Sequence, residues 1–156
     1  MQTQEVEKME ENKMDKNLEH VQNIVKDMEK YASGDYFLHN GELFPIDKDE
    51  FCKKNGCLYH KGVYIMPDGE EIADEDLEVT TIGDYFDDFY DINYVIGGNK
   101  KYKACHVLVA FGGPNIYIDT WAQQVQLYWR NEKATADIPL DLCEQIDEFF
   151  ETIYNC

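Results

Sequence analysis

The chain has 156 residues, and its 32 acidic side chains outnumber its 14 basic ones for a formal net charge of −18 at pH 7. Such a charge excludes direct binding to nucleic acid or to anionic membranes, because their phosphates would repel the protein. A content of 44% apolar and 13% aromatic residues argues against disorder and predicts one folded domain. The sequence starts MQTQEVEKMEEN and has no apolar run of signal-peptide or membrane-span length, so we expect a cytoplasmic protein.

An amphipathic helix is expected at the N-terminus, over residues 1–32. Apolar side chains at a 4-3-4-3 spacing form one stripe along it, namely Met14, Leu18, Val21, Val25 and Met28. Ile24 and Tyr31 lie beside this stripe and widen it. Residues 1–11 lack this pattern, and we expect them to be frayed or disordered. The stripe spans only about two heptads, which favours docking on the chain's own domain over a coiled coil with a second copy. A homodimer stays an alternative.

The rest of the chain, residues 33–156, predicts a single α+β domain whose first part, 33–80, is rich in hairpins. Asn40-Gly41 between two apolar runs is a strong signal for a tight hairpin turn. The elements expected in this part are a hairpin at 36–44, a two-turn helix at 47–54 and a second pair of strands at 58–66.

An acidic segment follows. There is no Lys or Arg between Gly62 and Asn99, and eleven carboxylates lie between Asp68 and Asp91. Thr81 and the residue three positions later have the pattern of a capping box, which predicts the start of a helix. One side of that helix would be apolar, formed by Ile82, Tyr85, Phe86, Phe89 and Tyr90. The other side would be acidic, formed by Asp84, Asp87, Asp88 and Asp91.

The spacing on this acidic side is the reason to suspect a function. Carboxylates at Asp84, Asp88 and Asp91 recur about once per turn, roughly 5 to 6 Å apart along the axis, which is the scale of phosphate spacing on a nucleic-acid strand. A merely solvated acidic face is the simpler alternative. However, neighbouring like charges oppose helix formation, and no nearby Lys offsets them here.

Residues 81–156 predict a helix, an antiparallel meander of about four strands and a second helix. The strands are expected at 92–96, 102–111, 116–119 and 124–130. The last strand alternates between two faces. Its buried face would hold Val125, Leu127 and Trp129, and its polar face Gln124, Gln126, Tyr128 and Arg130.

The closing helix is expected to begin with Asp141 as its N-cap. Its buried side would be formed by Leu142, Ile146, Phe149, Phe150 and Ile153. Its exposed side would be a second acidic face, formed by Glu144, Asp147, Glu148 and Glu151. The predicted fold class is therefore α+β, with the antiparallel sheet flanked by acidic helices.

The sequence does not predict an enzyme, and no catalytic residue or cofactor is assigned. Cys105 and His106 are adjacent on a predicted strand, so their side chains point to opposite faces and cannot work as a nucleophile and base. Nucleophile-elbow, P-loop and zinc-protease motifs are absent from the sequence. Cys52, Cys57 and His60 come nearest to a zinc ligand set, but a fourth ligand would have to come from Cys105 or His106, so we expect no metal.

The C-terminal half carries a set of motifs, namely Ile82-Gly-Asp-Tyr-Phe86, Ala110-Phe-Gly-Gly-Pro-Asn-Ile-Tyr-Ile-Asp-Thr120, Val125-Gln-Leu-Tyr-Trp129, Ile146-Asp-Glu-Phe-Phe150 and the terminal Tyr-Asn-Cys156. These motifs resemble a family of small acidic proteins carried by phages and integrative elements. The resemblance implies a mobile-element accessory protein in the cytoplasm of a bacterial host. Small acidic proteins in that setting are often anti-CRISPR or anti-restriction inhibitors that occupy the DNA site of a nuclease.

Two hypotheses follow. In the first, the protein mimics nucleic acid and binds the basic cleft of a CRISPR effector or restriction nuclease. The carboxylates standing in for phosphates would be Asp74, Glu75, Asp76, Asp84, Asp87, Asp88, Asp91, Glu144, Asp147, Glu148 and Glu151. In the second, the protein is an interaction module that binds through aromatic side chains near Gly112–Asn115, namely Tyr117, Trp121 and Tyr128. Salt should weaken only the first mode steeply.

Overall fold

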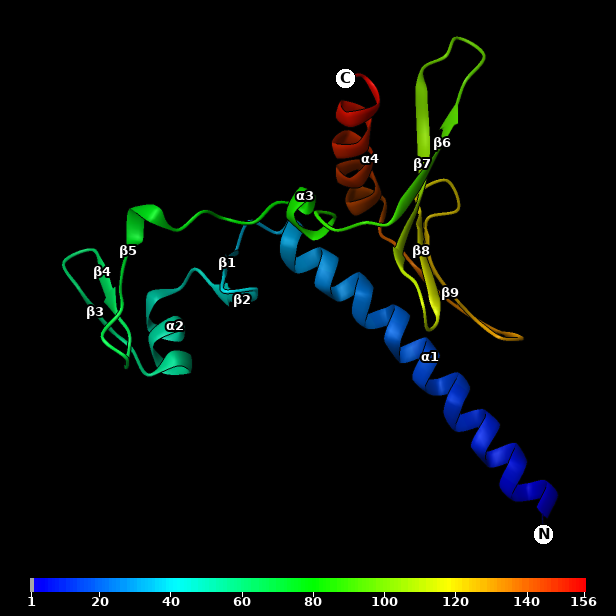
Figure 1. Cartoon of the computed structure of the whole chain (residues 1–156), viewed down its shortest axis with the longest axis horizontal. Coiled ribbons are helices and arrows are strands. Elements are labelled where there is room, and N and C mark those ends of the chain that lie inside the picture. The colour runs from blue at the N-terminus through cyan, green and yellow to red at the C-terminus, as the bar shows by residue number, and fades with distance from the viewer. Residues whose placement is uncertain (1) are drawn as a thin grey trace.

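The computed structural model describes residues 2–156, apart from the side chains of Gln2 and of residues 10–14. The chain forms two lobes joined by a narrow neck, with the smaller lobe at the left of Figure 1. The neck consists of residues 33–35, which leave the first helix, and residues 77–81, which return to the larger lobe. Helices and antiparallel strands are both present, so the α+β prediction is confirmed.

Helix α1 spans Gln2–Ala32 and begins well before the apolar stripe that predicted it. Val21, Val25 and Met28 are buried in the core of the larger lobe, as the stripe required. Leu18 is exposed, and the side chain of Met14 lies outside the described residues. This face is thus used within the chain, which confirms docking on its own domain. Within the described residues, no helix is both long and apolar enough to cross a membrane.

The larger lobe contains one antiparallel sheet whose strands follow each other as a meander, in the order β10-β9-β8-β7-β6. The strands are β6 (Asp91–Ile96), β7 (Tyr102–Ala110), β8 (Asn115–Asp119), β9 (Gln124–Trp129) and β10 (Glu132–Asp137). The prediction of about four strands was therefore wrong by one. Strand β10 reads Glu-Lys-Ala-Thr-Ala-Asp, with little β propensity, and it is stabilised by pairing with β9 and by contact with α1.

The inner face of this sheet packs against α1 and α4 around Cys105, Val107, Ile118, Val125 and Leu127. The predicted alternation along β9 fails at two positions. Trp129 ends the strand and is 37% exposed, with the Arg130 guanidinium 5.3 Å from its ring. Gln126 is buried instead, because it lies between Tyr117 and Thr135 of the flanking strands.

Helix α4 spans Leu140–Tyr154. Leu142, Ile146 and Phe150 are buried as predicted, Phe149 is half-buried and Ile153 is exposed. The predicted N-cap was wrong, because Pro139 occupies that position and Asp141 already lies inside the first turn. Asp141 at that position still interacts favourably with the positive end of the helix dipole.

The smaller lobe has its own aromatic core, formed by Phe37, Phe44, Phe51, Cys57 and Tyr64. Its elements are β1 (Tyr36–His39), β2 (Glu42–Pro45), α2 (Lys48–Asn55), β3 (Leu58–His60), β4 (Val63–Ile65), β5 (Glu71–Ala73) and the 3-10 turn η1 (Asp74–Asp76). The predicted hairpin turn is confirmed, with φ of 50° at Asn40 and 78° at Gly41. Strand β5 was not predicted, and it pairs with β4 to make a three-stranded sheet.

The predicted acidic helix was also wrong. Helix α3 contains only Ile82–Tyr85, after which the chain turns and Asp91 begins β6. Aspartates have low helix propensity and repel one another, while the Tyr90 N–H is free to donate to the Leu108 carbonyl at 2.9 Å. A row of carboxylates spaced once per helical turn therefore does not exist in this segment.

Candidate functional site

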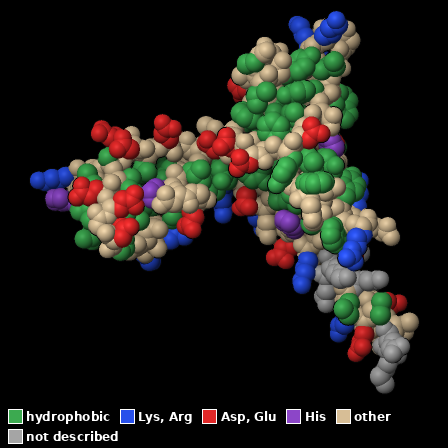
Figure 2. Space-filling view, in the orientation of Figure 1, with side chains coloured by type: hydrophobic (Ala, Val, Ile, Leu, Met, Phe, Trp, Pro, Cys, Tyr) green, Lys and Arg blue, Asp and Glu red, His purple; other side chains and the backbone are tan. Residues whose placement is uncertain are grey.

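The acidic side chains are largely without basic partners. Figure 2 shows Asp and Glu gathered along the upper side of the smaller lobe and over the neck, with no Lys or Arg among them in this view. In the described part of the chain, a single Lys or Arg lies within 4.0 Å of a carboxylate, which is Lys48 at 3.4 Å from Asp74. No other described carboxylate has a Lys or Arg nitrogen within that distance.

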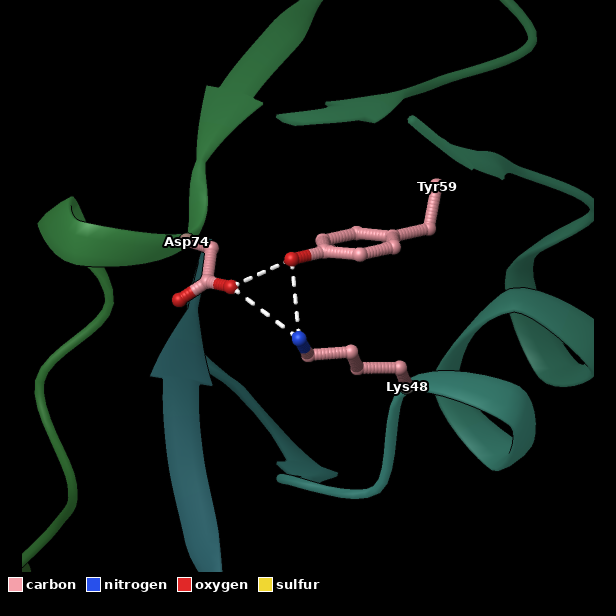
Figure 3. A network of polar contacts seen from close by, with 3 residues as sticks. All are labelled: Lys48, Tyr59 and Asp74. Atoms are coloured by element: carbon pink, nitrogen blue, oxygen red, sulfur yellow. Dashed lines mark hydrogen bonds and ion pairs between the residues drawn. The ribbon is translucent and has the colours of Figure 1, made fainter. Parts of the chain in front are cut away.

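Asp74 belongs to a compact network in the smaller lobe (Figure 3). The Lys48 ammonium donates to the Tyr59 hydroxyl at 2.8 Å, and that hydroxyl donates to Asp74 Oδ2 at 2.6 Å. The hydrogen bond from Tyr59, followed by the charge of Lys48, lowers the pKa of the Asp74 carboxyl. Asp74 thus ties η1 to α2 and β3, whereas its neighbours Glu75 and Asp76 are exposed.

This network gives a prediction about pH. Because the folded-state pKa of Asp74 is depressed, its contribution to stability is present above the unfolded value of 3.8 and is lost as pH falls through the folded value. The Asp74→Asn variant should therefore melt below the wild type at pH 7, and the two should converge as the solution is acidified past 3.8. Thermal unfolding followed by circular dichroism from pH 7 to pH 2 tests this. A melting difference that persists at the acid end would show that the carboxylate charge does not matter.

After the carboxylates of η1, a second acidic group lies around the turn between α3 and β6. Asp84 accepts the Thr81 N–H at 2.7 Å, which confirms the capping box. Asp91 accepts the N–H of the following residue at 2.8 Å. Asp87 and Asp88 are exposed in the turn itself. The structure thus keeps these carboxylates together at the surface, but on a turn rather than along a helix.

The third acidic group is on α4, and one of its predicted members was misassigned. Asp147 is half-buried against the sheet, where its Oδ1 accepts the Tyr102 hydroxyl at 2.6 Å and the Thr120 hydroxyl at 2.7 Å. Burial raises the pKa of the Tyr102 hydroxyl, and its hydrogen bond to Asp147 raises that pKa further, so the hydroxyl keeps its proton. Asp147 therefore anchors α4 to the sheet and does not belong to the exposed acidic face.

The other members of that face are exposed, as predicted: Glu144, Glu148 and Glu151. Spacings of four and three residues place them roughly 4.5 to 6 Å apart along the axis. The regular row of carboxylates that the sequence predicted for residues 84–91 is thus found on α4 instead.

The alternative aromatic surface is only partly assembled. Tyr117 stacks on His106 with ring centroids 4.5 Å apart, and Tyr128 meets Tyr117 edge-on at 6.0 Å. The Lys133 ammonium extends the row, 5.3 Å from the Tyr128 ring. Trp121 is exposed, but it follows the opposite end of β8 from Asn115, so it does not join the other two aromatic residues.

The two cysteines of the smaller lobe, Cys52 and Cys57, lie close together. The Cys57 thiol donates to the sulfur of Cys52 at 3.3 Å, and burial raises the pKa of Cys57 to about 11. His60 is exposed on β3, and Cys105 belongs to the core of the other lobe. Among the residues described, no three His, Cys, Asp or Glu side chains are grouped so that they could hold a metal ion.

Sequence reasoning missed a groove at the neck. A cavity of about 380 Å³ lies there, and exposed Leu38 and Val79 line it together with the carboxylates of Asp76, Glu78 and Asp84. We call this cavity the neck groove. Its acidic members belong to the segment without Lys or Arg. Its apolar members come from β1, β5 and the neck, and patterns along the sequence do not show that these elements meet.

No family model, curated protein or solved structure matches this chain. The resemblance to small acidic phage proteins therefore stays a prediction.

Proposed function

We propose that the protein inhibits a host defence nuclease, such as a CRISPR effector or a restriction enzyme, by occupying its basic nucleic-acid cleft. The observation that carries this proposal is the set of exposed carboxylates over the neck and the α3–β6 turn, which have no basic neighbour among the described residues. Clefts that hold nucleic acid are lined with Lys and Arg, so a concentrated negative surface on a folded protein is complementary to them.

The carboxylates come from several elements rather than from one helix. Glu75, Asp76, Asp87 and Asp88 lie on η1 and the turn after α3, and the exposed glutamates of α4 add a regular row. Distributed charges of this kind steer a basic partner over long range and set its orientation. Asp74 and Asp147 contribute to the fold, so we leave them out of the proposed contact surface.

The first test is affinity capture from bacterial lysate containing CRISPR and restriction nucleases, with and without excess duplex DNA. We expect one nuclease to be retained and DNA to displace it. The triple variant Asp76→Lys, Asp87→Lys and Asp88→Lys should lose the nuclease, because like charges would then face each other. The matched control, Glu5→Lys, Glu7→Lys and Glu19→Lys on α1, changes the net charge equally and should retain it. Retention unaffected by DNA, or equal loss in both variants, would contradict the proposal.

A second candidate is an interaction module that uses the row of His106, Tyr117 and Tyr128 on the sheet. The stacking of these rings favours it, because ordered aromatic side chains that stay partly accessible are typical of protein interfaces. Under this alternative, binding survives moderate salt and is lost in Tyr117→Ala or Tyr128→Ala. Under the proposed function, those two substitutions leave nuclease binding intact.

A further inference from the structure

The neck groove combines an apolar surface with an acidic one. Leu38 and Val79 are 43% and 46% exposed at its edge. Asp76, Glu78 and Asp84 line the same cavity, and all three carboxylates are exposed. An apolar surface surrounded by charges of one sign is typical of a recognition site for a partner of the opposite sign.

The groove is held in shape by the backbone. Val79 forms a β-bridge with Phe37, and the Thr80 N–H donates to the Tyr36 carbonyl at 2.9 Å. Thr80 is itself buried, and its hydroxyl lies 3.3 Å from the carbonyl oxygens of Tyr31 and Tyr36. The exposed apolar side chains therefore sit on a fixed strand connection, so a partner would bind them without ordering the segment first.

The charge of the groove limits what can bind there. Among the described residues that line the groove, only His39 can carry positive charge, and its ring nitrogen already contacts the Asn40 amide at 3.2 Å. A second copy of this chain would bring its own −18 net charge and be repelled. Nucleic acid is repelled for the same reason. A partner segment carrying Lys or Arg satisfies the carboxylates, and its aliphatic stems can cover the exposed apolar side chains.

We propose that the neck groove binds a basic segment of a partner protein in which Lys or Arg residues flank one or two apolar side chains. This inference rests on the proposed function, because it names the part of the acidic surface where a basic cleft is engaged. The apolar side chains of the segment pack on Leu38 and Val79, and its cations pair with Asp76, Glu78 and Asp84. The groove thereby adds shape selectivity to an interaction that would otherwise depend on charge alone.

The experiment measures binding of synthetic peptides to the full chain by fluorescence anisotropy. The probe is a labelled 14-residue peptide of Lys, Arg and Leu. Two control peptides replace every Leu by Ser or every Lys and Arg by Glu. We expect the probe to bind at least about tenfold more tightly than the Ser peptide, since its Leu side chains bury apolar area. The Glu peptide should not bind. Because all three peptides meet the wild-type protein, this comparison does not depend on the folding of any variant.

Variants locate the site. Leu38→Ser with Val79→Ser, and separately Asp76→Asn with Glu78→Gln, should each weaken probe binding about tenfold. The matched control, Glu5→Gln with Glu7→Gln on α1, removes the same charge at exposed positions away from the groove and should change affinity less than twofold. Circular dichroism of each variant checks that the fold is retained.

Three results would overturn the inference: equal affinity for the Leu and Ser peptides, equal weakening by the α1 control, or unaltered binding in the Leu38→Ser and Val79→Ser double variant. Each of them leaves the proposed function standing if DNA still displaces the captured nuclease. The converse result is also possible: the probe binds at the groove, but DNA does not affect capture of the nuclease. That result would support the groove as a peptide-binding site and contradict nucleic-acid mimicry.

Discussion

Replacing Asp147 by alanine is expected to lower the free energy of unfolding by about 2 to 4 kcal/mol. The carboxylate accepts two hydroxyls, from Tyr102 at 2.6 Å and Thr120 at 2.7 Å, and both donors come from buried residues. The Tyr102 hydroxyl would lose this acceptor, at a desolvation cost of roughly 1 to 3 kcal/mol. The Thr120 hydroxyl would lose a bond to a charged group, worth about 1.5 to 3 kcal/mol, and keep only the Cys105 carbonyl at 3.3 Å. The Thr120 oxygen also accepts the Cys105 N–H at 2.9 Å, so the loss extends to the hydrogen bonding of β7.

Chemical denaturation of Asp147→Ala, Asp147→Asn and Glu148→Ala measures this effect. Glu148 is exposed one residue further along α4, so its replacement should change stability by less than about 0.5 kcal/mol. Asparagine keeps one acceptor oxygen and should recover part of the loss. If Asp147→Ala were as stable as Glu148→Ala, Asp147 would be a free surface carboxylate after all, and it would return to the candidate contact surface.

The second large effect is expected from Phe51→Ala in the smaller lobe. The Phe51 ring is fully buried, and its centroid lies 5.1 Å from Phe37, 5.2 Å from Phe44 and 4.8 Å from Tyr64. Removing a buried phenylalanine costs about 3 to 5 kcal/mol, through lost burial and the cavity that remains. Since the two cores have no residue in common, the loss should be concentrated in the smaller lobe.

Hydrogen exchange followed by mass spectrometry distinguishes local from global loss in this variant. Amides of β4 and β5 should exchange much faster than in the wild type, while those of β7, β8 and β9 keep their protection. The matched substitution Leu58→Ala removes a side chain that is 71% exposed and should leave both lobes protected. Equal loss of protection in both lobes would mean that they unfold as one cooperative unit.

Some of the fold could be predicted because local chemistry determines it. Asn40-Gly41 tolerates positive φ at both positions and forms the expected hairpin turn. Gly56 takes a left-handed conformation and ends α2, whose first turn is capped by Asp47 through the N–H of Glu50. The stripe through Val21 in α1 likewise identified a buried helix face.

Other features depend on tertiary contacts that patterns along the chain do not reveal. The predicted acidic helix ends after Tyr85, because Phe86 and Phe89 pack against Phe150 of α4 and the chain then enters β6. At Gly83 an added Cβ would lie 2.8 Å from the Phe149 ring, so the close packing of α3 on α4 requires glycine at this position. In the sequence, the same glycine indicates only a residue that destabilises a helix.

The candidate site shows the same division. Composition alone located an acidic, arginine- and lysine-free segment, and its carboxylates are exposed as expected. Helical periodicity then misassigned Asp147 to the exposed acidic face. Periodicity predicts the side of the helix on which a residue lies, but it does not show that Tyr102 and Thr120 donate hydrogen bonds to Asp147. The apolar half of the neck groove was missed for a related reason, since it depends on a single β-bridge between Phe37, the neighbour of Leu38, and Val79.

The most direct test of acidic mimicry is the affinity of the full chain for its captured nuclease, measured by calorimetry at several salt concentrations, with and without a duplex DNA substrate. The account predicts a fall on the order of a hundredfold between 50 and 200 mM salt, because each carboxylate contact replaces a phosphate contact of the nuclease. It also predicts that DNA and the protein exclude each other. A ternary complex of nuclease, DNA and protein, or an affinity that salt leaves unchanged, would contradict it.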